Sequence, residues 1–341
     1  MIIAQINSKH LIYNFEQFKQ KTKTEIIPVL KSNAYGHGIN EIFQIIKDKV
    51  KKIAVFDLEE ALKLKFKDIL ILKPIYKEDE IYLAYKNDFI FNLCSHRQIE
   101  VIKKLRIKPR VEIEIDTGMN RTGIWYEEFE KFYNNVKNFV KIEGVYSHFA
   151  NADNEIDDFS QVQYEKFIKV VNNLNVKKHI SNTSAALRYN YYLDFVRIGL
   201  GLYGVYPSEF LKRFLDLKPV MTLKCDVIQV KFVKKGESIG YSRTFKADKN
   251  MKIAIISFGY ADGFPIEGSN LLYVFAKNKF RKVLGRISMD SSVIEGDDLQ
   301  EGDLVEIFGE NINVLDIAKK LNKIPYVILT SIGNRVKRIV V

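Results

Sequence analysis

The feature that most constrains the fold is an alternation of short apolar runs with amphipathic helical patterns, from residue 24 to about residue 200. Short apolar runs bounded by turn-forming residues are typical of buried strands. We predict eight strands: Thr24–Lys31, Lys52–Asp57, Asp68–Pro74, Phe89–Leu93, Arg110–Asp116, Val140–His148, Val176–Asn182 and Phe195–Leu200. Eight strands with helical crossovers make a (β/α)8 barrel of the TIM type. The unit at 75–88 is the weakest, because it leaves little room for a long helix.

The pattern changes after about residue 217. Alternating β-branched runs now dominate, separated by glycine-containing turns, which is typical of antiparallel strands. Five strands are predicted: Thr222–Lys231, Lys252–Ser257, Leu271–Phe275, Ser291–Glu295 and Asp303–Phe308. One short helix, 313–321, interrupts them. We therefore predict a barrel domain at 1–216 and a mostly antiparallel β-domain at 217–341.

Charge and composition exclude several classes of function. The net charge is +11, but the lysines are spread along helical stretches among acidic residues, and no nucleic-acid-binding motif is present. No segment is apolar enough to span a membrane and the N-terminus lacks the core of a signal peptide, so we expect a cytoplasmic protein. Cys94 and Cys225 lie far apart in strand-like runs, which predicts core positions and no metal site.

One lysine stands at a chemically useful place. The apolar run Ile26–Leu30 ends in Lys31, and small, polar and turn-forming residues follow as far as Gly38. A buried strand that ends in this way delivers its last side chain to the carboxyl rim of the sheet. Desolvation lowers the pKa of a lysine, which then forms an imine or acts as a base. The alternative is a solvated lysine at a strand end.

Other unusual residues also follow predicted strands. Arg121 comes after the fifth strand, His148 closes the sixth, the run Asn182-Thr183-Ser184 follows the seventh and Arg197 lies in the eighth. The active site of such a barrel gathers at the carboxyl ends of the strands, so we predict that these side chains converge around Lys31. Taken singly, Arg121 is more typical of a surface and His148 of a satisfied strand end.

A phosphate site is predicted after strands seven and eight, where such barrels commonly build one. Thr183 and Ser184 supply hydroxyl groups, and Gly199 and Leu200 supply backbone NH groups beside the eighth strand. The alternative, in which Asn182 and its neighbours cap the next helix, uses the same free amides and is compatible with the sequence.

The run from Pro28 to Gly38 closely resembles the lysine motif of alanine racemases, the pyridoxal 5'-phosphate (PLP) enzymes that interconvert L- and D-alanine. The resemblance implies that Lys31 carries PLP as a Schiff base and that Tyr35 contacts its phosphate. It also implies that Arg197 faces the pyridine nitrogen, with His148 behind it. Because an arginine does not give up its proton, the ring nitrogen stays unprotonated and the weaker electron sink suits racemisation.

The β-domain carries further family signatures. Gly240-Tyr241-Ser242-Arg243-Thr244 resembles the motif of the catalytic tyrosine, so Tyr241 is implied as the base for L-alanine and Lys31 as the base for D-alanine. Bases on both faces of a planar intermediate are sufficient for racemisation. In the family this tyrosine comes from the partner subunit, which implies a homodimer with composite sites.

Two more motifs match, Phe258–Gly263 and Gly285–Asp290. The resemblance implies that the backbone amide of Met289 holds the substrate carboxylate together with Arg121. It also implies that Tyr260 and Asp290 line the entrance of the site.

The sequence departs from the family at two positions. Many members have a carbamylated lysine where this chain has Glu114, and we hypothesise that Glu114 supplies that negative charge and pairs with Arg121. The alternative is that Glu114 pairs with another buried base. Some members have a tyrosine at the position of Asn334, so the size limit for the substrate is left open.

The prediction is therefore a PLP-dependent alanine racemase that supplies D-alanine for peptidoglycan. The alternatives are a racemase of broader specificity, which accepts serine or other small amino acids, and a PLP-binding protein without racemase activity. A decarboxylase of the same fold is disfavoured, because neither Cys94 nor Cys225 lies in a matching motif. Nucleic-acid binding by the basic surface is the remaining alternative.

Overall fold

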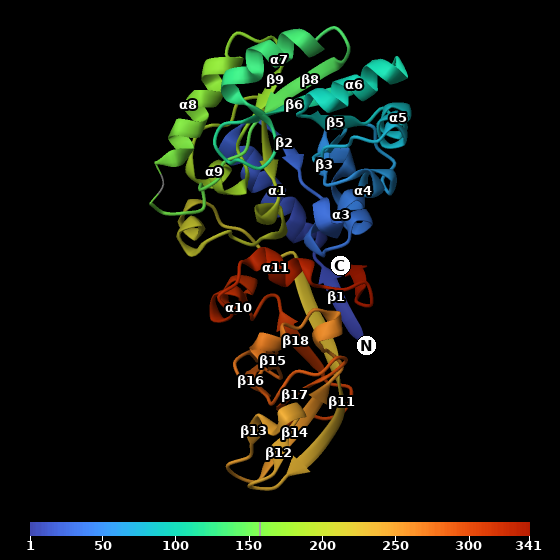
Figure 1. Cartoon of the computed structure of the whole chain (residues 1–341). Coiled ribbons are helices and arrows are strands. Elements are labelled where there is room, and N and C mark those ends of the chain that lie inside the picture. Colours follow the sequence, from blue (N-terminus) through green and yellow to red (C-terminus); the bar gives the residue numbers. More distant parts are fainter. Residues whose placement is uncertain (157) are drawn as a thin grey trace.

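The computed structural model describes residues 1–156 and 158–341. Its upper half in Figure 1 is a barrel of parallel strands in the order β2-β10-β9-β8-β6-β5-β4-β3. A bridge between Val29 and Ala54 joins β2 to β3, so the barrel is nearly closed. The strands are β2 (Glu25–Pro28), β3 (Ile53–Val55), β4 (Ile69–Ile71), β5 (Ile90–Leu93), β6 (Arg110–Asp116), β8 (Lys141–Tyr146), β9 (Lys177–His179) and β10 (Phe195–Ile198). The eight predicted strands are confirmed.

Helices cover the outside of this barrel (Figure 1). They are α1 (Ser8–Thr22), α2 (Lys31–Tyr35), α3 (Ile39–Ile46), α4 (Leu58–Leu62), α5 (Glu78–Lys86), α6 (His96–Leu105), α7 (Phe129–Val136), α8 (Phe159–Val171) and α9 (Thr183–Arg188). Side-chain caps set several of their starts: Asp57 accepts from the amide of Glu60 at α4, and Ser95 from that of Gln98 at α6. The weakest unit of the pattern, 75–88, holds the nine-residue α5.

Strand β6 shows how the barrel interior differs from an ordinary apolar core. Val111, Ile113 and Ile115 are buried, as expected for side chains that face the helices. Glu112 and Glu114 alternate with them and are also buried, at 0% and 5% exposure. The interior of the barrel therefore contains carboxylates that need partners.

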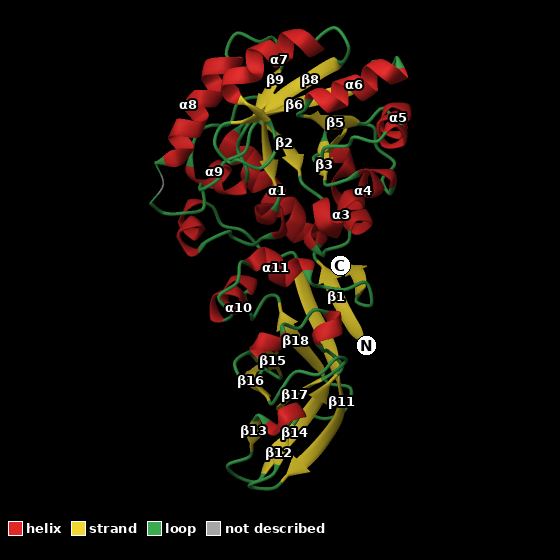
Figure 2. Ribbon diagram, viewed as in Figure 1, coloured by secondary structure: helices red, strands yellow, loops and turns green. Residues whose placement is uncertain are grey.

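The second half of the molecule is an eight-stranded, mostly antiparallel sheet, drawn in yellow in the lower part of Figure 2. Its strands are β11 (Met221–Val233), β14 (Met251–Ile256), β15 (Tyr273–Ala276), β16 (Lys279–Leu284), β17 (Ser292–Glu295), β18 (Leu304–Phe308), β1 (Ile2–Ile6) and β19 (Lys337–Val340). A separate hairpin pairs β12 (Ser238–Ile239) with β13 (Phe245–Lys246). The predicted fold class is confirmed.

Chain ends complete the C-terminal sheet. Strand β1 pairs antiparallel with β11 and parallel with β19, so residues 2–6 belong to the sheet of the second domain. The predicted boundary between residues 216 and 217 stays a prediction. Two short helices, α10 (Val314–Lys320) and α11 (Pro325–Thr330), lie between the sheet and the barrel, and α11 contacts α2 (Figure 1).

The structure also bears on the cysteines, on membrane-spanning helices and on groups of metal-ligating side chains. Both cysteines are buried and free, as expected for core residues. Within residues 1–156 and 158–341, every helix is too short or too polar to span a bilayer, and no group of three metal-ligating side chains is found.

Candidate active site

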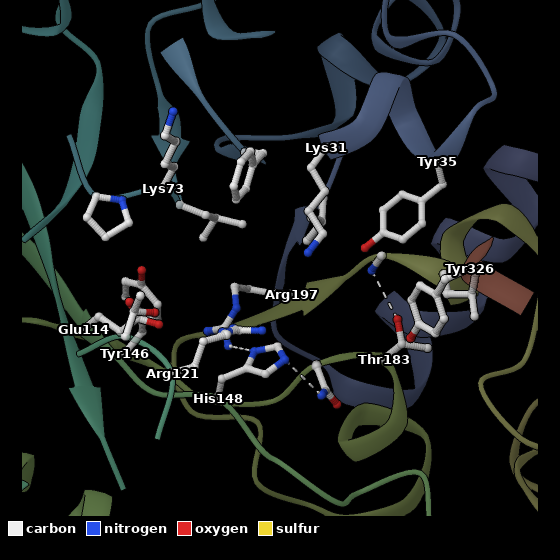
Figure 3. Close-up of a pocket in the computed structure, with 18 residues that line it drawn as sticks. Lys31, Tyr35, Lys73, Glu114, Arg121, Tyr146, His148, Thr183, Arg197 and Tyr326 are labelled. Carbon is white, nitrogen blue, oxygen red and sulfur yellow. Dashed lines mark hydrogen bonds between the residues drawn. The ribbon is translucent and has the colours of Figure 1, made fainter. Parts of the chain in front are cut away.

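A cavity of about 400 Å³ opens at the carboxyl ends of the barrel strands. In Figure 3, Lys31 and Arg197 point into it from two sides, and Tyr35 and Thr183 gather at one end. Ten of the predicted site residues line it: Lys31, Tyr35, Glu114, Arg121, His148, Asn182, Thr183, Arg197, Gly199 and Leu200. Ser184 is buried behind this wall. The predicted convergence at the barrel rim is present in the structure.

The segment after Lys31 has an unusual backbone. Ser32, Asn33, Ala34 and Tyr35 all have φ between 52° and 56°, so four consecutive residues turn in the left-handed sense. Such a conformation costs about 1–2 kcal/mol for each L-residue. Glu60 offsets part of this cost, because its carboxylate accepts hydrogen bonds from the amides of Asn33 (3.0 Å) and Phe56 (2.9 Å). The turn sets Lys31 and Tyr35 on the same cavity wall.

The electrostatics of the cavity favour a neutral Lys31. Burial is the largest cause that lowers its pKa, and the positive charges of Arg121 and Arg197 lower it further, while Glu60 opposes them. An amine with a lowered pKa is a better nucleophile and a better base. Lys31 is therefore suited to the chemistry that its sequence position predicted.

One end of the cavity is built for an anion. The Thr183 hydroxyl accepts from the amides of Gly199 (3.1 Å) and Gly201 (3.4 Å), so its hydrogen remains for a ligand. A Cβ at position 199 would lie 2.4 Å from the Tyr35 hydroxyl oxygen, so only glycine allows this approach. Asn182 also caps α9 by accepting from the Ala185 amide (3.0 Å), and the capping alternative thus coexists with the anion site.

Arg197 is held at the centre of the cavity floor. Its guanidinium donates to the carbonyls of Ser147 (2.6 Å) and Ile180 (3.1 Å) and to His148 Nδ1 (3.1 Å), and it is 4% exposed. Burial and the adjacent charge of Arg197 lower the pKa of His148 well below the usual value. His148 is therefore neutral and, with Nδ1 as acceptor, carries its hydrogen on Nε2.

Glu114 has neutral partners. It accepts from Asn92 Nδ2 (2.7 Å) and from Thr122, and no ion pair within 4 Å joins it to Arg121 among the described residues. Burial raises its pKa, and the hydrogen bonds of Thr122 and Asn92 and the charge of Arg121 oppose that rise. The negative charge that we hypothesised is close enough to act on Arg121, but without direct contact.

The residues predicted from the β-domain lie outside this cavity. Tyr241 is 69% exposed, Met289 53% and Tyr260 43%. Figure 1 places β12 and β13, which flank Tyr241, at the end of the β-domain away from the barrel. Lys31 and Tyr241 of one chain are thus far apart.

The two β-domain motifs lie side by side. The amides of Tyr260 and Ala261 donate to the carbonyls of Ser288 and Met289, both at 3.0 Å. A Cβ on Gly259 would lie 2.2 Å from the Met289 carbonyl oxygen, so the close approach requires glycine. Asp290 forms an ion pair with Arg335 (2.8 Å). Met289, Tyr260 and Asp290 therefore belong to one exposed patch of the β-domain, whereas Arg121, the other residue predicted to bind the carboxylate, lines the barrel cavity.

Several cavity residues were missed by the sequence analysis. Tyr326, on α11, packs against Tyr35 with ring centroids 6.0 Å apart and lines the anion end, whereas Asn334 is exposed and does not line the cavity. Tyr146, the last residue of β8, also lines the cavity, and its buried hydroxyl has no partner among the described residues. No motif signals these positions, because each is one tyrosine among 18.

These residues fit PLP in three respects. Thr183, Gly199 and Tyr35 form a cradle for a phosphate, which an added Cβ at position 199 would fill. Lys31, with its lowered pKa, is suited to bind an aldehyde carbon. Arg197 supplies a hydrogen-bond donor for a ring nitrogen.

Comparison with known families agrees with this geometry. Residues 6–207 match the profile described as "Alanine racemase, N-terminal domain", and residues 220–340 match "Alanine racemase, C-terminal domain". The chain is 35% identical to an alanine racemase of Carboxydothermus hydrogenoformans over 99% of both chains. It is 34% identical to alanine racemase 2 of Caldanaerobacter subterraneus subsp. tengcongensis, over 98% of this chain and 94% of that relative.

Solved structures give the same result. The alanine racemase of Clostridium difficile 630 superimposes with a TM-score of 0.92 at 31% identity, covering 100% of this chain and 95% of that one. The enzyme from D-cycloserine producing Streptomyces lavendulae superimposes with a TM-score of 0.93 at 27% identity, covering 100% and 97%.

Proposed function

This chain belongs to the alanine racemase family, and from that premise we propose how its own residues interconvert L- and D-alanine. The family consists of PLP-dependent isomerases, and its general role is the supply of D-alanine for peptidoglycan. The observation that carries the proposal is the convergence of Lys31, Arg121 and Arg197 in one cavity with an anion cradle at its end.

The cofactor would be held by residues of the barrel. Lys31 would bind it through its amino group, while Thr183, Tyr35 and the amides of Gly199 and Leu200 would receive its phosphate. When bound, PLP supplies an electron sink that makes the Cα proton of alanine acidic enough to exchange. Arg197 would face the ring nitrogen as a donor that does not give up its proton, and would so limit the strength of that sink.

Lys31 exchanges the proton on one face of the substrate and Tyr241 exchanges it on the other. Arg121, together with the Met289 amide, holds the substrate carboxylate. His148, whose pKa is well below its usual value, is neutral, accepts from Arg197 at Nδ1 and has its Nε2 3.5 Å from Asn182 Nδ2, so it links Arg197 to the wall of the cofactor cavity.

The active form is a homodimer. Tyr241 and Met289 are exposed and lie outside the cavity of their own chain, and Figure 1 places the hairpin β12–β13 around Tyr241 at the end of the β-domain away from the barrel, so a second copy must bring them to Lys31. In an isologous dimer the same surface patch acts twice, and two composite sites result. Tyr260 and Asp290, in the same patch, would then line the entrance.

The test is racemisation in deuterated water. The purified chain with PLP is given L-alanine, and the products are separated by chirality and weighed by mass spectrometry. D-Alanine with deuterium at Cα is expected, and a Lys31→Ala variant that lacks both the bound-cofactor absorbance and the product is the control. If serine or another small amino acid is racemised as fast as alanine, the specificity is broader. If neither is racemised by cofactor-bound protein, the proposal is wrong.

A further inference from the structure

Glu112 has no role in the mechanism above, although it is fully buried inside the barrel, beneath the cavity that it does not line. It stands between two side chains. Oε1 is 2.5 Å from Lys52 Nζ, and Oε2 is 2.8 Å from His179 Nε2. The other ring nitrogen of His179, Nδ1, contacts Arg197 Nη1. Four side chains therefore connect the floor of the active site to the barrel interior.

The direction of these hydrogen bonds is determined by chemistry. Lysine and arginine only donate, and an ionised carboxylate only accepts. His179 Nδ1 must therefore be the acceptor for Arg197, and His179 Nε2 must carry the hydrogen that is donated to Glu112. Lys52 Nζ and His179 Nε2 both donate to Glu112, because its carboxylate is the only acceptor in this group that remains for them. His179 is thus restricted to one tautomer.

The surroundings favour an ionised Glu112. Burial opposes its charge, but His179 and Lys52 outweigh burial and lower its pKa to about 2. Burial lowers the pKa of His179 to about 4 in spite of the opposing charge of Glu112, so the ring is neutral. Gly144 on the adjacent strand leaves room, because a Cβ there would lie 3.4 Å from the carboxyl carbon of Glu112 and 2.9 Å from the Lys177 carbonyl oxygen.

Other contacts restrain the same elements. The His179 ring stacks on Tyr146, with centroids 5.1 Å apart and an angle of 4° between the planes. Arg197 contacts the same tyrosine, with its guanidinium carbon 5.1 Å from the Tyr146 centroid. Stacking fixes the plane of the His179 ring. It does not select a tautomer, because the ring stacks equally well with its hydrogen on Nδ1 or on Nε2. Two contacts make that choice together: Glu112 accepts at Nε2, and Arg197 donates to Nδ1.

We propose that Glu112 is a positioning residue of the active site: it holds His179 in the tautomer that accepts from Arg197 and thereby orients the guanidinium towards the cofactor ring. Lys52 balances the charge of Glu112 in the barrel interior. The inference rests on the proposed function only for the group that Arg197 faces, because the tautomer of His179 is a property of the protein itself.

The test is Glu112→Gln in the full chain with bound PLP. A carboxamide replaces one acceptor oxygen by an NH2 donor, so either Lys52 or His179 Nε2 meets a donor. The readout is the tautomer of His179 by NMR of 15N-histidine-labelled protein, which is tractable because the chain has five histidines. His179→Gln assigns the signal. The absorbance of the bound cofactor against pH, kcat and KM are measured alongside.

The expected result is a hydrogen on Nε2 in the wild type and a weaker preference for this tautomer in Glu112→Gln, because only the contact of Arg197 with Nδ1 then selects it. The variant is expected to show a shifted pH profile of cofactor absorbance and a kcat at least about tenfold lower in both directions, with the KM for alanine changed less than threefold. The matched control is Glu143→Gln on the neighbouring strand β8. Glu143 is in an ion cluster with Arg110 and Lys141 that does not reach Arg197, so kcat and tautomer are expected to be unchanged.

If Glu112→Gln does not fold, the double variant Lys52→Met/Glu112→Met removes both charges together and keeps the side-chain volumes. It is expected to fold, to show a weaker preference for the hydrogen on Nε2 and to show the same loss of kcat. An unchanged tautomer with wild-type kcat in the folded variant overturns the proposal, as does an equal loss in Glu143→Gln. A wild type without racemase activity contradicts the proposed function, while the tautomer still decides the inference.

Discussion

The two halves of the proposed site differ sharply in how far one chain completes them. In the barrel, Lys31, Arg197 and Thr183 stand in a formed cavity with partners at hydrogen-bond distance. In the β-domain, Tyr241 and Met289 are more than half exposed and do not line that cavity. Binding and positioning are therefore properties of the folded chain, whereas proton exchange on the second face depends on assembly.

The largest effect on racemisation should come from variants that each disable one half of the composite site. Lys31→Ala and Tyr241→Phe are each expected to lower racemisation by about 10³-fold or more, because each removes one proton-transfer group. Mixed in equal amounts and allowed to exchange subunits, the two variants should recover about a quarter of the wild-type activity, since half of the dimers are mixed and each has one intact site. Racemisation is measured before and after exchange.

The controls are the two variants incubated separately, which should stay inactive. No recovery in a mixture whose mixed dimers are demonstrated by mass spectrometry would show that Lys31 and Tyr241 do not meet across the dimer.

Acid should lower the stability of the barrel domain through its buried histidine His37. Burial lowers the pKa of His37 from 6.5 to about 4, so the unfolded state binds more protons below pH 6.5. The free energy of unfolding should fall as the pH decreases from 6.5 to 4 and then level off for this group, by up to about 3 kcal/mol. His37→Asn should flatten this decline, measured by urea unfolding at each pH.

The matched control is His10→Asn, at a partly buried histidine of α1. Equal flattening in both variants would show that the burial of His37 does not cause the acid sensitivity.

The Glu114→Gln variant tests how the barrel half of the site supports substrate binding by Arg121. Glu114→Gln removes the carboxyl group that interacts electrostatically with nearby Arg121, and the carboxamide no longer accepts at both oxygens. We expect the KM for alanine to rise about tenfold, corresponding to one charge-assisted interaction, with a smaller change in kcat. Steady-state kinetics with both enantiomers gives the values, and exposed Glu130→Gln is the control. A KM within twofold of the wild type would rule out a role for Glu114 in substrate binding.

The smallest effect is expected at Tyr326, where the β-domain half of the chain reaches its own barrel. Tyr326→Phe removes one hydroxyl beside the anion cradle, so the affinity for PLP should fall about threefold to tenfold, while that for pyridoxal, which has no phosphate, should not change. Cofactor absorbance titrations of the cofactor-free chain measure both affinities.

Tyr203→Phe is the matched control for this prediction. Its hydroxyl donates to the Val29 carbonyl (2.9 Å), so its loss should lower thermal stability without altering the preference for the phosphorylated cofactor. An equal loss of affinity for PLP and pyridoxal in Tyr326→Phe would mean that the hydroxyl does not contact the phosphate end.

Local patterns were sufficient for most of the barrel. The eight strands were predictable because most of them are short apolar runs or, as in β6, alternate apolar with polar residues. The fold then requires that Lys31, Arg121, His148 and Arg197 share one rim. Strands β1 and β19 were not predicted, because each is stabilised by pairing with segments more than 200 residues away or at the opposite terminus. The few residues of such a strand do not show which distant segment it will pair with.

The order of the barrel strands, the side chains available at their ends and the family could all be predicted from the residues alone. Three features became visible only in the folded chain: Glu112 receives hydrogen bonds from Lys52 and His179, Tyr326 reaches the anion cradle, and Tyr241 lies away from Lys31. The physical reason is the sequence separation between the residues that make each contact. Periodicity follows from contacts between neighbours in the chain, whereas hydrogen-bond direction, burial and the completion of a site depend on residues that only the folded chain brings together.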